Sequence, residues 1–480
     1  MTAPRAADLI GRAARGFLWA LLAAGAGRVL SVAALAVVAR ILAPEEYGLF
    51  AFALVYITYL NTLGDFGVGT ALVYWKERVG DAAQITFLVN LATGITWCVL
   101  TLVLAPVVAD FFGSPSGTPV LRALAAIFII RSLGNTHDAL CRKELRFRAR
   151  LVPELGLAAT KAGITVTLAV AGVGVWSLVW GQLAGEAVWT TALWRAVPWR
   201  PQVRWPLEIF RPMLRYSREI VAVNVVAAVV HHADLVVVGR MLGVEALGFY
   251  QLAYKIPEIA VILVLWQVNT VLFPAFSKVE DPSRLASAYV ETIRYVALLA
   301  LPAAAGLFML AEPILLNVFG EQWGPSVPIL RSLAVYVAFR ALGSPAGDFM
   351  KAVGRPGILA ALGVVRGLVL VPALVFAAGL GAAAVGATMA GVAALALPAE
   401  LLIVRALTGG RLRDALAAMQ DGLVATAVLV TFLVAWTHLI PDSGGLTLLV
   451  GGVVLGAAIY LVAVRMVAPA AVQRALASLR

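Results

Sequence analysis

The sequence predicts an all-α polytopic membrane protein with fourteen transmembrane helices, and three observations indicate this fold class. Of the 480 residues, 62% are hydrophobic and only 13% are charged, whereas soluble domains have about 45–50% apolar and about 25% charged residues. The apolar residues occur in runs of about 20, the length of helix that crosses a hydrocarbon core of about 30 Å. The basic residues between the runs fall almost entirely on one alternate set of connections. Most of the chain is therefore expected to lie in lipid.

Fourteen apolar runs are candidates for membrane spans, and short connections join them. The first run contains Arg28 and is too long for a signal peptide, so we expect no cleavage there. An even number of spans places both termini on the same side of the membrane. The predicted spans are residues 16–39, 47–73, 84–109, 119–140, 151–171, 174–194, 218–239, 246–276, 288–311, 327–349, 357–378, 382–404, 420–440 and 446–467.

The distribution of Lys and Arg predicts the orientation of these spans. Of the 37 basic residues, 26 lie in one alternate set of connections and tails, nine lie inside spans, and only Arg40 and Arg240 lie in the opposite set. Basic connections stay on the cytoplasmic side during insertion. We therefore expect both termini to be cytoplasmic. A missed or surplus span would invert every later connection, so the bias also favours the count of fourteen.

An internal repeat at an offset of 200 residues indicates a duplicated architecture. Residues 40–50 read RILAPEEYGLF and residues 240–250 read RMLGVEALGFY; a common interfacial turn is the competing explanation. Six spans separate the copies, so the two halves run in the same direction, as in transporters with parallel repeats. The predicted division is an N-terminal lobe (1–195), a cytoplasmic interfacial linker (196–217), a C-terminal lobe (218–405) and a segment with spans 13 and 14 and a cytoplasmic tail (406–480).

Ionisable residues inside the spans are the candidate functional residues. A cation at the centre of the bilayer costs about 2.5–3.5 kcal/mol on insertion scales, so it normally faces a water-filled cavity or a partner. The cations near the estimated midplane are Arg28, Arg131, Lys161, Lys255, Arg340 and Arg366, and the acidic residues well inside spans are Asp65, Glu186, Asp234, Glu258 and Glu400. The midplane is therefore net basic, which suits an anionic ligand in a wet cavity.

We expect five cations to line this cavity and bind substrate: Arg28, Lys161, Lys255, Arg340 and Arg366. Asp65, Asp234 and Glu258 are candidates for ion coupling or gating. A competing interpretation is that such charges pair and hold the bundle together. The pairing and cavity interpretations are evenly balanced for Lys255 and Glu258, which are three residues apart on one helical face. For Arg131 and Glu186 the structural interpretation is favoured.

Catalytic and cofactor motifs give little support for an enzyme. His231 and His232 beside Asp234 could bind a metal or relay protons, although adjacent histidines point about 100° apart on a helix. No glycine precedes a lysine, so a Walker A loop is missing. The cations are spread between apolar runs rather than gathered on one solvated face, which argues against nucleic acid. We expect no catalytic residues, no metal and no cofactor.

Several motifs together resemble the polysaccharide transporter (Wzx-type flippase) family of the multidrug/oligosaccharidyl-lipid/polysaccharide (MOP) superfamily. Their order and spacing over nearly the entire chain carry the resemblance, because each motif is degenerate. Ala43 departs from the glycine usual in the first turn, whereas Gly243 keeps it in the second. The motifs are residues 39–50, residues 65–72 (DFGVGTAL), residues 174–179 (GVWSLV), residues 239–243, residues 248–250, residues 272–277 (LFPAFS) and residues 319–323 (FGEQW).

The resemblance implies two six-helix lobes in a V, as in MATE transporters, two additional C-terminal helices, and a basic central cavity. It implies flipping of a polyprenyl-diphosphate-linked oligosaccharide to the outer leaflet of a bacterial inner membrane, for lipopolysaccharide or exopolysaccharide biosynthesis. The implied partners are that lipid-linked oligosaccharide, membrane lipids, and a polymerase and glycosyltransferases of the same pathway. Arg28 and Lys255 match basic cavity positions of the family, and Asp65 matches its acidic motif. The alternatives are a cation-coupled multidrug antiporter and a membrane glycan ligase or transferase.

Overall fold

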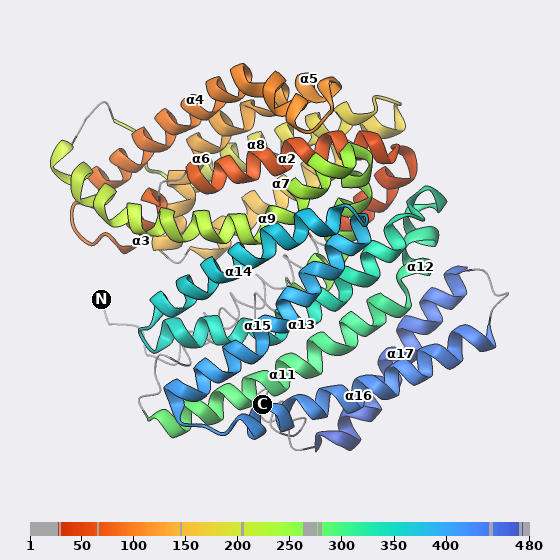
Figure 1. Ribbon diagram of the computed structural model, residues 1–480. Helices are drawn as coiled ribbons and strands as arrows, with labels where there is room; N and C mark the ends of the chain where they lie inside the picture. The colour runs from red at the N-terminus through yellow and green to blue at the C-terminus, as the bar shows by residue number, and fades with distance from the viewer. Residues whose placement is uncertain are drawn as a thin grey trace. The chain divides into compact units, whose positions relative to one another are not determined.

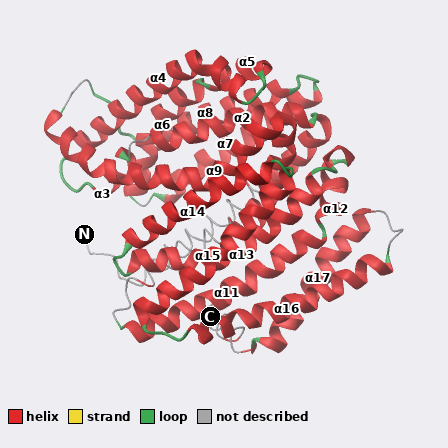
Figure 2. Ribbon diagram, viewed as in Figure 1, coloured by secondary structure: helices red, strands yellow, loops and turns green. Residues whose placement is uncertain are grey.

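The computed structural model describes residues 27, 30–64, 67–144, 146–202, 206–262, 276, 281–440, 445–469 and 473. These residues form helices and short connections, with no strand among them (Figure 2). Ten helices in this part of the chain are long and apolar enough to cross a membrane. The prediction of an all-α multi-pass membrane protein is therefore confirmed, whereas the count of fourteen spans stays a prediction.

The chain divides into two compact units, and the first comprises residues 1–228 and 243–245. Small residues bring two of its helices close together: a Cβ added to Gly185 would lie 3.1 Å from the carbonyl oxygen of Leu157, and one added to Gly181 would collide with Thr165. Two glycines four residues apart thus allow the backbones of these two helices to approach closely. The helices are a segment at 30–41, α2 (Pro44–Gly64), α3 (Val68–Tyr74), α4 (Val79–Phe111), η1 (Pro115–Gly117), α5 (Thr118–Leu124), α6 (Ala126–Lys143), α7 (Phe147–Val170) and α8 (Val175–Ala196).

The second unit comprises residues 229–242 and 246–480. Its last two helices, α16 and α17, lie beside α11 (Figure 1). The hydroxyl of Tyr460 donates a hydrogen bond to the carbonyl of Leu298, and Trp436 Nε1 joins α16 to α17 through the carbonyl of Leu448 at 3.1 Å. The helices are the later part of α9 (Leu207–Pro257), η2 (Glu258–Ile262), α11 (Pro282–Met309), α12 (Ala311–Ile314), η3 (Leu315–Phe319), η4 (Glu321–Trp323), α13 (Ser326–Ala352), α14 (Pro356–Ala378), α15 (Ala382–Thr408), α16 (Leu412–Leu439) and α17 (Gly445–Val467).

Helix α9 contains two predicted spans and a sharp reversal between them. Gly243 has φ 89° and ψ 174°, outside the helical region, in a conformation that side chains with a Cβ rarely adopt. Tyr250 nevertheless contacts Asp234, sixteen residues away, whereas a straight helix would separate them by about 24 Å. The chain therefore doubles back at Gly243, where the sequence predicts the connection 240–245.

The equivalent turn near residue 43 has a different geometry. Ala43 does not adopt a positive φ, as expected for a residue with a Cβ. Its backbone N–H instead donates to the Glu46 carboxylate at 3.1 Å, which caps the start of α2. The same carboxylate lies against Gly174, where a Cβ would be 2.5 Å from Glu46 Oε1. The departure at Ala43 thus changes the turn geometry.

Candidate functional site

The predicted site residues fall into three groups. Arg28 and Asp65 lie outside the described residues. Lys161 is on α7 of the first unit, where α7 packs against Gly185 of α8. The other predicted residues belong to the second unit: Asp234, Lys255, Glu258, Arg340 and Arg366.

A buried polar cluster surrounds Arg340 in the second unit. Arg340 extends from α13, and its Nη1 lies 3.3 Å from the hydroxyl of Tyr336 and 3.5 Å from that of Tyr254. The guanidinium also lies over the Tyr336 ring, 5.8 Å from its centroid. Tyr254 stacks with Tyr250 at a centroid distance of 6.5 Å. We call these four residues together with Asp234 the Arg340 cluster.

Asp234 is the member of the Arg340 cluster that contacts Tyr250. It is 0% exposed and accepts a 2.9 Å hydrogen bond from the Tyr250 hydroxyl through Oδ2. Among the described residues, none forms a hydrogen bond with its other oxygen, Oδ1. The tyrosines thus lie between the Asp234 carboxylate and the Arg340 guanidinium. Among the described residues, no carboxylate lies within 4 Å of that guanidinium.

Lys255 and Glu258, for which the sequence did not decide between pairing and a cavity role, form an ion pair. Lys255 Nζ lies 2.8 Å from Glu258 Oε2, and both side chains are partly exposed, at 43% and 32%. The pair neutralises one of the expected cavity cations within the protein. Its exposure leaves Lys255 accessible to a ligand.

Arg366 lies on α14, and its Nε forms no hydrogen bond with the part of the chain that the structure describes. His231 is within electrostatic range of both Arg366 and Arg340. Glu400 of α15 is within electrostatic range of Arg366, and its carboxylate lies against Gly343 of α13. The second unit therefore places two cations, Arg340 and Arg366, near His231 of α9. Among the described residues, no three potential metal ligands come together.

Arg131 and Glu186 form an ion pair in the first unit. Arg131 Nε lies 2.9 Å from Glu186 Oε2, and the carboxylate side chain is 4% exposed. Gln182 donates to the other carboxylate oxygen at 3.0 Å, and the guanidinium lies over the Trp189 ring. The structure therefore agrees with the favoured interpretation of this pair as a link between helices α6 and α8.

A second repeat relates Arg131 to Arg340, and the initial sequence interpretation missed it. Residues 119–134 read PVLRALAAIFIIRSLG, and 209 residues later the chain reads PILRSLAVYVAFRALG. The final glycines of the two segments, Gly134 on α6 and Gly343 on α13, both lie tightly against the second long helix that follows, α8 and α15 respectively. A search at offsets other than 200 would have found this signal.

The position equivalent to Glu186 holds no carboxylate in the second unit. Gly174 and Gly381, which precede α8 and α15, both have a positive φ, at 65° and 105°. Glu186 lies twelve residues after the first glycine, and Ala393 lies twelve residues after the second. Ala393 is buried. Arg340 thus occupies the place of a paired arginine but lacks the acid that neutralises its counterpart.

A polytopic helical protein with repeated halves and an arginine without a carboxylate partner inside a membrane span has the properties of a transporter. Residues 37–328 match the model of a family described as "Polysaccharide biosynthesis protein". The chain belongs to this family. The resemblance inferred from the motifs is therefore confirmed.

Two curated relatives match most of the chain. Over 381 residues it is 28% identical to the lipopolysaccharide biosynthesis protein WzxC of Escherichia coli (strain K12), covering 78% of this chain and 76% of the relative. Over 361 residues it is 27% identical to the succinoglycan biosynthesis transport protein ExoT of Rhizobium meliloti (strain 1021), covering 75% and 73%. Both relatives carry names from polysaccharide biosynthesis.

Two solved structures show the fold. The lipid II flippase MurJ in an inward closed conformation matches with a TM-score of 0.74 and 14% identity, covering 94% of this chain and 98% of that chain. An inward-facing MATE multidrug resistance transporter of the MOP superfamily matches with a TM-score of 0.64 and 16% identity, covering 79% and 95%. The chain thus has a MOP-like fold.

Proposed function

We propose that this protein is a flippase that moves a polyprenyl-diphosphate-linked oligosaccharide from the cytoplasmic to the outer leaflet by alternating access, for surface polysaccharide biosynthesis. Membership of the polysaccharide biosynthesis family supports this function. The name of ExoT refers to transport, and MurJ, which has a similar fold, is named a lipid II flippase. The proposal makes the protein a transporter rather than an enzyme.

The observation that carries the proposal is Arg340 without a carboxylate partner among the described residues, at the position where Arg131 has Glu186. A guanidinium presents several N–H donors in a planar fork that matches phosphate oxygens. Tyr254 and Tyr336 hold this fork through their hydroxyls and leave other donors for a ligand. A lipid diphosphate would supply the missing negative charge.

The remaining cavity cations of the proposal are Arg28, Lys161, Lys255 and Arg366. Lys255 would exchange part of its contact with Glu258 for the diphosphate when substrate enters. Asp65, Asp234 and Glu258 are the proposed residues for ion coupling or gating. The unpartnered Oδ1 of Asp234 supports this role, because a buried carboxylate oxygen has a high demand for a proton, a cation or a hydrogen-bond donor.

The membrane potential would give the transport its direction. Moving one charge across 100 mV is worth about 2.3 kcal/mol. A doubly negative diphosphate that leaves a negative cell interior would gain about 4–5 kcal/mol if it senses the whole field. This direction requires cytoplasmic termini and a bacterial inner membrane, which the basic connections support. A polymerase and glycosyltransferases of the same pathway are the proposed partners.

A reconstitution assay tests the function. The purified protein is placed in liposomes with a fluorescent polyprenyl-diphosphate oligosaccharide in the inner leaflet, and a membrane-impermeant quencher reports the lipid that reaches the outer leaflet. We expect liposomes with protein to move the fluorescent oligosaccharide lipid faster than empty liposomes, and an outside-positive potential to increase this rate further. Fluorescent phosphatidylcholine should not move. Equal rates with and without protein would overturn the proposal.

A cation-coupled antiporter is the second candidate function. The fold similarity to a MATE transporter and the buried carboxylate of Asp234 favour it. An antiporter would lower the accumulation of cationic dyes in cells and would acidify or alkalinise liposomes as the dye moves. The flippase proposal predicts no effect on dye accumulation.

A further inference from the structure

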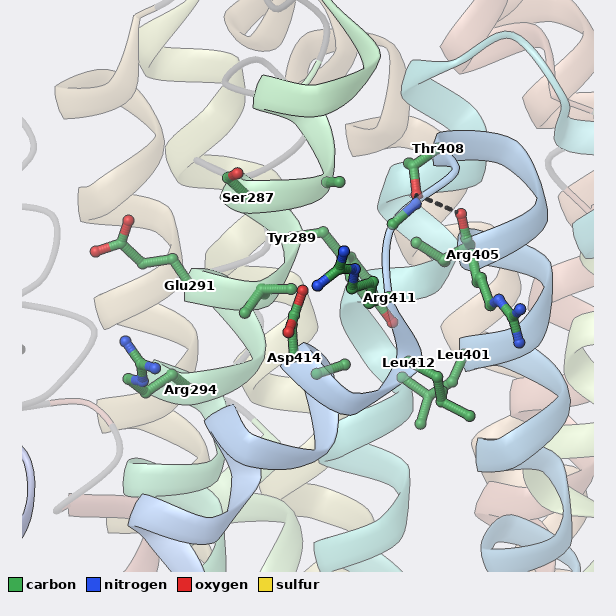
Figure 3. Close-up of a pocket in the computed structure, with 15 residues that line it drawn as sticks. Ser287, Tyr289, Glu291, Arg294, Leu401, Arg405, Thr408, Arg411, Leu412 and Asp414 are labelled. Carbon is green, nitrogen blue, oxygen red and sulfur yellow. Dashed lines mark hydrogen bonds between the residues drawn. The ribbon is translucent and has the colours of Figure 1, made fainter.

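A cavity with arginine side chains lies in the second unit, and none of the residues assigned above to transport lines it. Its wall comes from the first turns of α11, the last turns of α15 and the start of α16. Figure 3 shows Ser287, Glu291 and Arg294 on one side, Arg405 and Thr408 on the other, and Arg411 between them. We propose that this cavity binds the phosphodiester headgroup of an anionic phospholipid in the inner leaflet.

The depth of the cavity in the membrane supports a headgroup ligand. The connection between α15 and α16 belongs to the set of basic connections that predicts the cytoplasmic side. The cavity walls combine the ends of three helices at that level. Basic pockets between transmembrane helices on this side bind acidic headgroups in membrane proteins.

The charges around the cavity leave one positive charge for a ligand. Arg294 is paired with Asp421 of α16 at 2.9 Å. Asp414, which also lines the cavity, lies 3.6 Å from Arg413. The other charged lining residues are two arginines, Arg405 and Arg411, and one carboxylate, Glu291. Neither arginine has a carboxylate within 4 Å among the residues that the structure describes.

The start of α16 adds to this positive charge. The helix begins at Leu412, and the residue that precedes it, Arg411, makes no side-chain cap hydrogen bond. Leu412 and Arg411 both line the cavity. The partial positive charge of a helix N-terminus attracts anions, and here it acts together with two arginine side chains.

The size and surroundings of the cavity favour a lipid over a larger or a fully soluble ligand. Its volume is about 270 Å³, slightly below the range of pockets that hold drug-sized ligands, so a headgroup fits better than an oligosaccharide. Leu402 and Leu416 follow the lining residues Leu401 and Ala415 in the chain and are 49% and 48% exposed. These side chains offer an apolar surface for acyl chains beside the phosphate site.

Lipid titration by native mass spectrometry tests the proposal on the full-length protein in detergent. Phosphatidylglycerol is the probe, phosphatidylcholine is the zwitterionic comparison, and soluble glycerol phosphate tests whether a phosphate alone suffices. We expect tighter binding of phosphatidylglycerol than of phosphatidylcholine, and no displacement by millimolar glycerol phosphate. Equal affinity for the two lipids, or displacement by glycerol phosphate, would overturn the assignment.

Charge variants place the binding at this cavity. The double variant Arg405→Gln/Arg411→Gln is expected to weaken phosphatidylglycerol binding about 30-fold, from the usual contribution of a basic residue near an anionic lipid. Glu291→Gln is expected to strengthen binding, which a merely misfolded protein would not do. The matched control is Arg355→Gln, an exposed arginine before α14 that does not line the cavity. Unchanged binding in the double variant, or an equal loss in the control, would contradict the proposal.

Discussion

The Tyr250 hydroxyl donates a 2.9 Å hydrogen bond to the buried carboxylate of Asp234, and this contact joins the two arms of α9 across the reversal at Gly243. Within the Arg340 cluster, the contact links the proposed coupling residue Asp234 to Arg340 through Tyr250 and Tyr254. A change in the charge or occupancy of Asp234 can therefore reach Arg340 through two aromatic rings and their hydroxyls. This connection would allow the proposed ion coupling at Asp234 to affect the proposed binding of an anionic substrate at Arg340.

Tyr250→Phe removes this donor, so that neither oxygen of Asp234 keeps a side-chain hydrogen-bond donor among the described residues. A buried acceptor without a partner costs about 1–3 kcal/mol, so we expect a lower unfolding temperature in detergent. The loss should shrink in an Asp234→Leu background, where no carboxylate remains. Equal losses in both backgrounds would mean that the phenol ring, rather than the hydrogen bond, stabilises the fold.

Lys255 and Glu258 allow the structural and transport roles of one ion pair to be separated. Lys255→Glu combined with Glu258→Lys keeps the pair but moves the cation by about one helical turn. We expect the reversed pair to restore the unfolding temperature lost in Lys255→Gln, and the flipping rate to stay at least about tenfold low, which corresponds to about 1.4 kcal/mol. Normal flipping by the reversed pair would show that Lys255 serves only to hold the fold.

Gly181 tests the close packing of α7 on α8. A Cβ at this position would lie 1.9 Å from Thr165 Oγ1 and 3.0 Å from the carbonyl oxygen of Lys161. Gly181→Ala is therefore expected to destabilise the protein by about 1–3 kcal/mol through overpacking. The matched control is Gly163→Ala on α7, where no atom lies within 4 Å of the added Cβ. Comparable thermal unfolding of the two variants would contradict the packing account.

The predicted topology can be tested by labelling single cysteines. Cys98 and Cys141 are both buried, so a membrane-impermeant maleimide should leave them largely unmodified in intact cells. Ser116→Cys lies in a predicted outward connection and should be labelled, whereas Glu77→Cys in a predicted inward connection should be labelled only after lysis. Labelling of both positions in intact cells would invalidate the fourteen-span orientation.

The fold was predictable because lipid imposes strong rules on composition. Runs of apolar residues and the bias of Lys and Arg between them depend on local physics. The predicted spans 84–109 and 382–404 each lie within one helix, α4 and α15, whereas the predicted span 47–73 is divided between α2 and α3. Gly243 likewise marked its turn through a conformation that other residues disfavour. These features need no knowledge of which helices touch.

The partners of the intramembrane charges were harder to predict, because they depend on helix packing. Lys255 and Glu258 could be recognised as a possible pair from their spacing on one helix. The pairing of Arg131 with Glu186 joins residues 55 positions apart, and the tyrosines around Arg340 come from α9 and α13. The repeat that aligns Arg131 with Arg340 is the sequence signal for this difference. It indicates that Arg131 has an acid partner, Glu186, and that the equivalent position in the second copy, Ala393, has no acid.

Replacement of Arg340 is the measurement that tests the central claim most directly. In the liposome assay, Arg340→Gln is compared with the double variant Arg131→Gln/Glu186→Gln, which removes the equivalent arginine together with its acid and leaves no unpaired charge. Both variants must elute as folded monodisperse protein. We expect flipping of the lipid-linked oligosaccharide to fall at least about tenfold in Arg340→Gln and to stay near the wild-type rate in the double variant. Wild-type flipping by Arg340→Gln would contradict the account of an arginine that binds the lipid diphosphate.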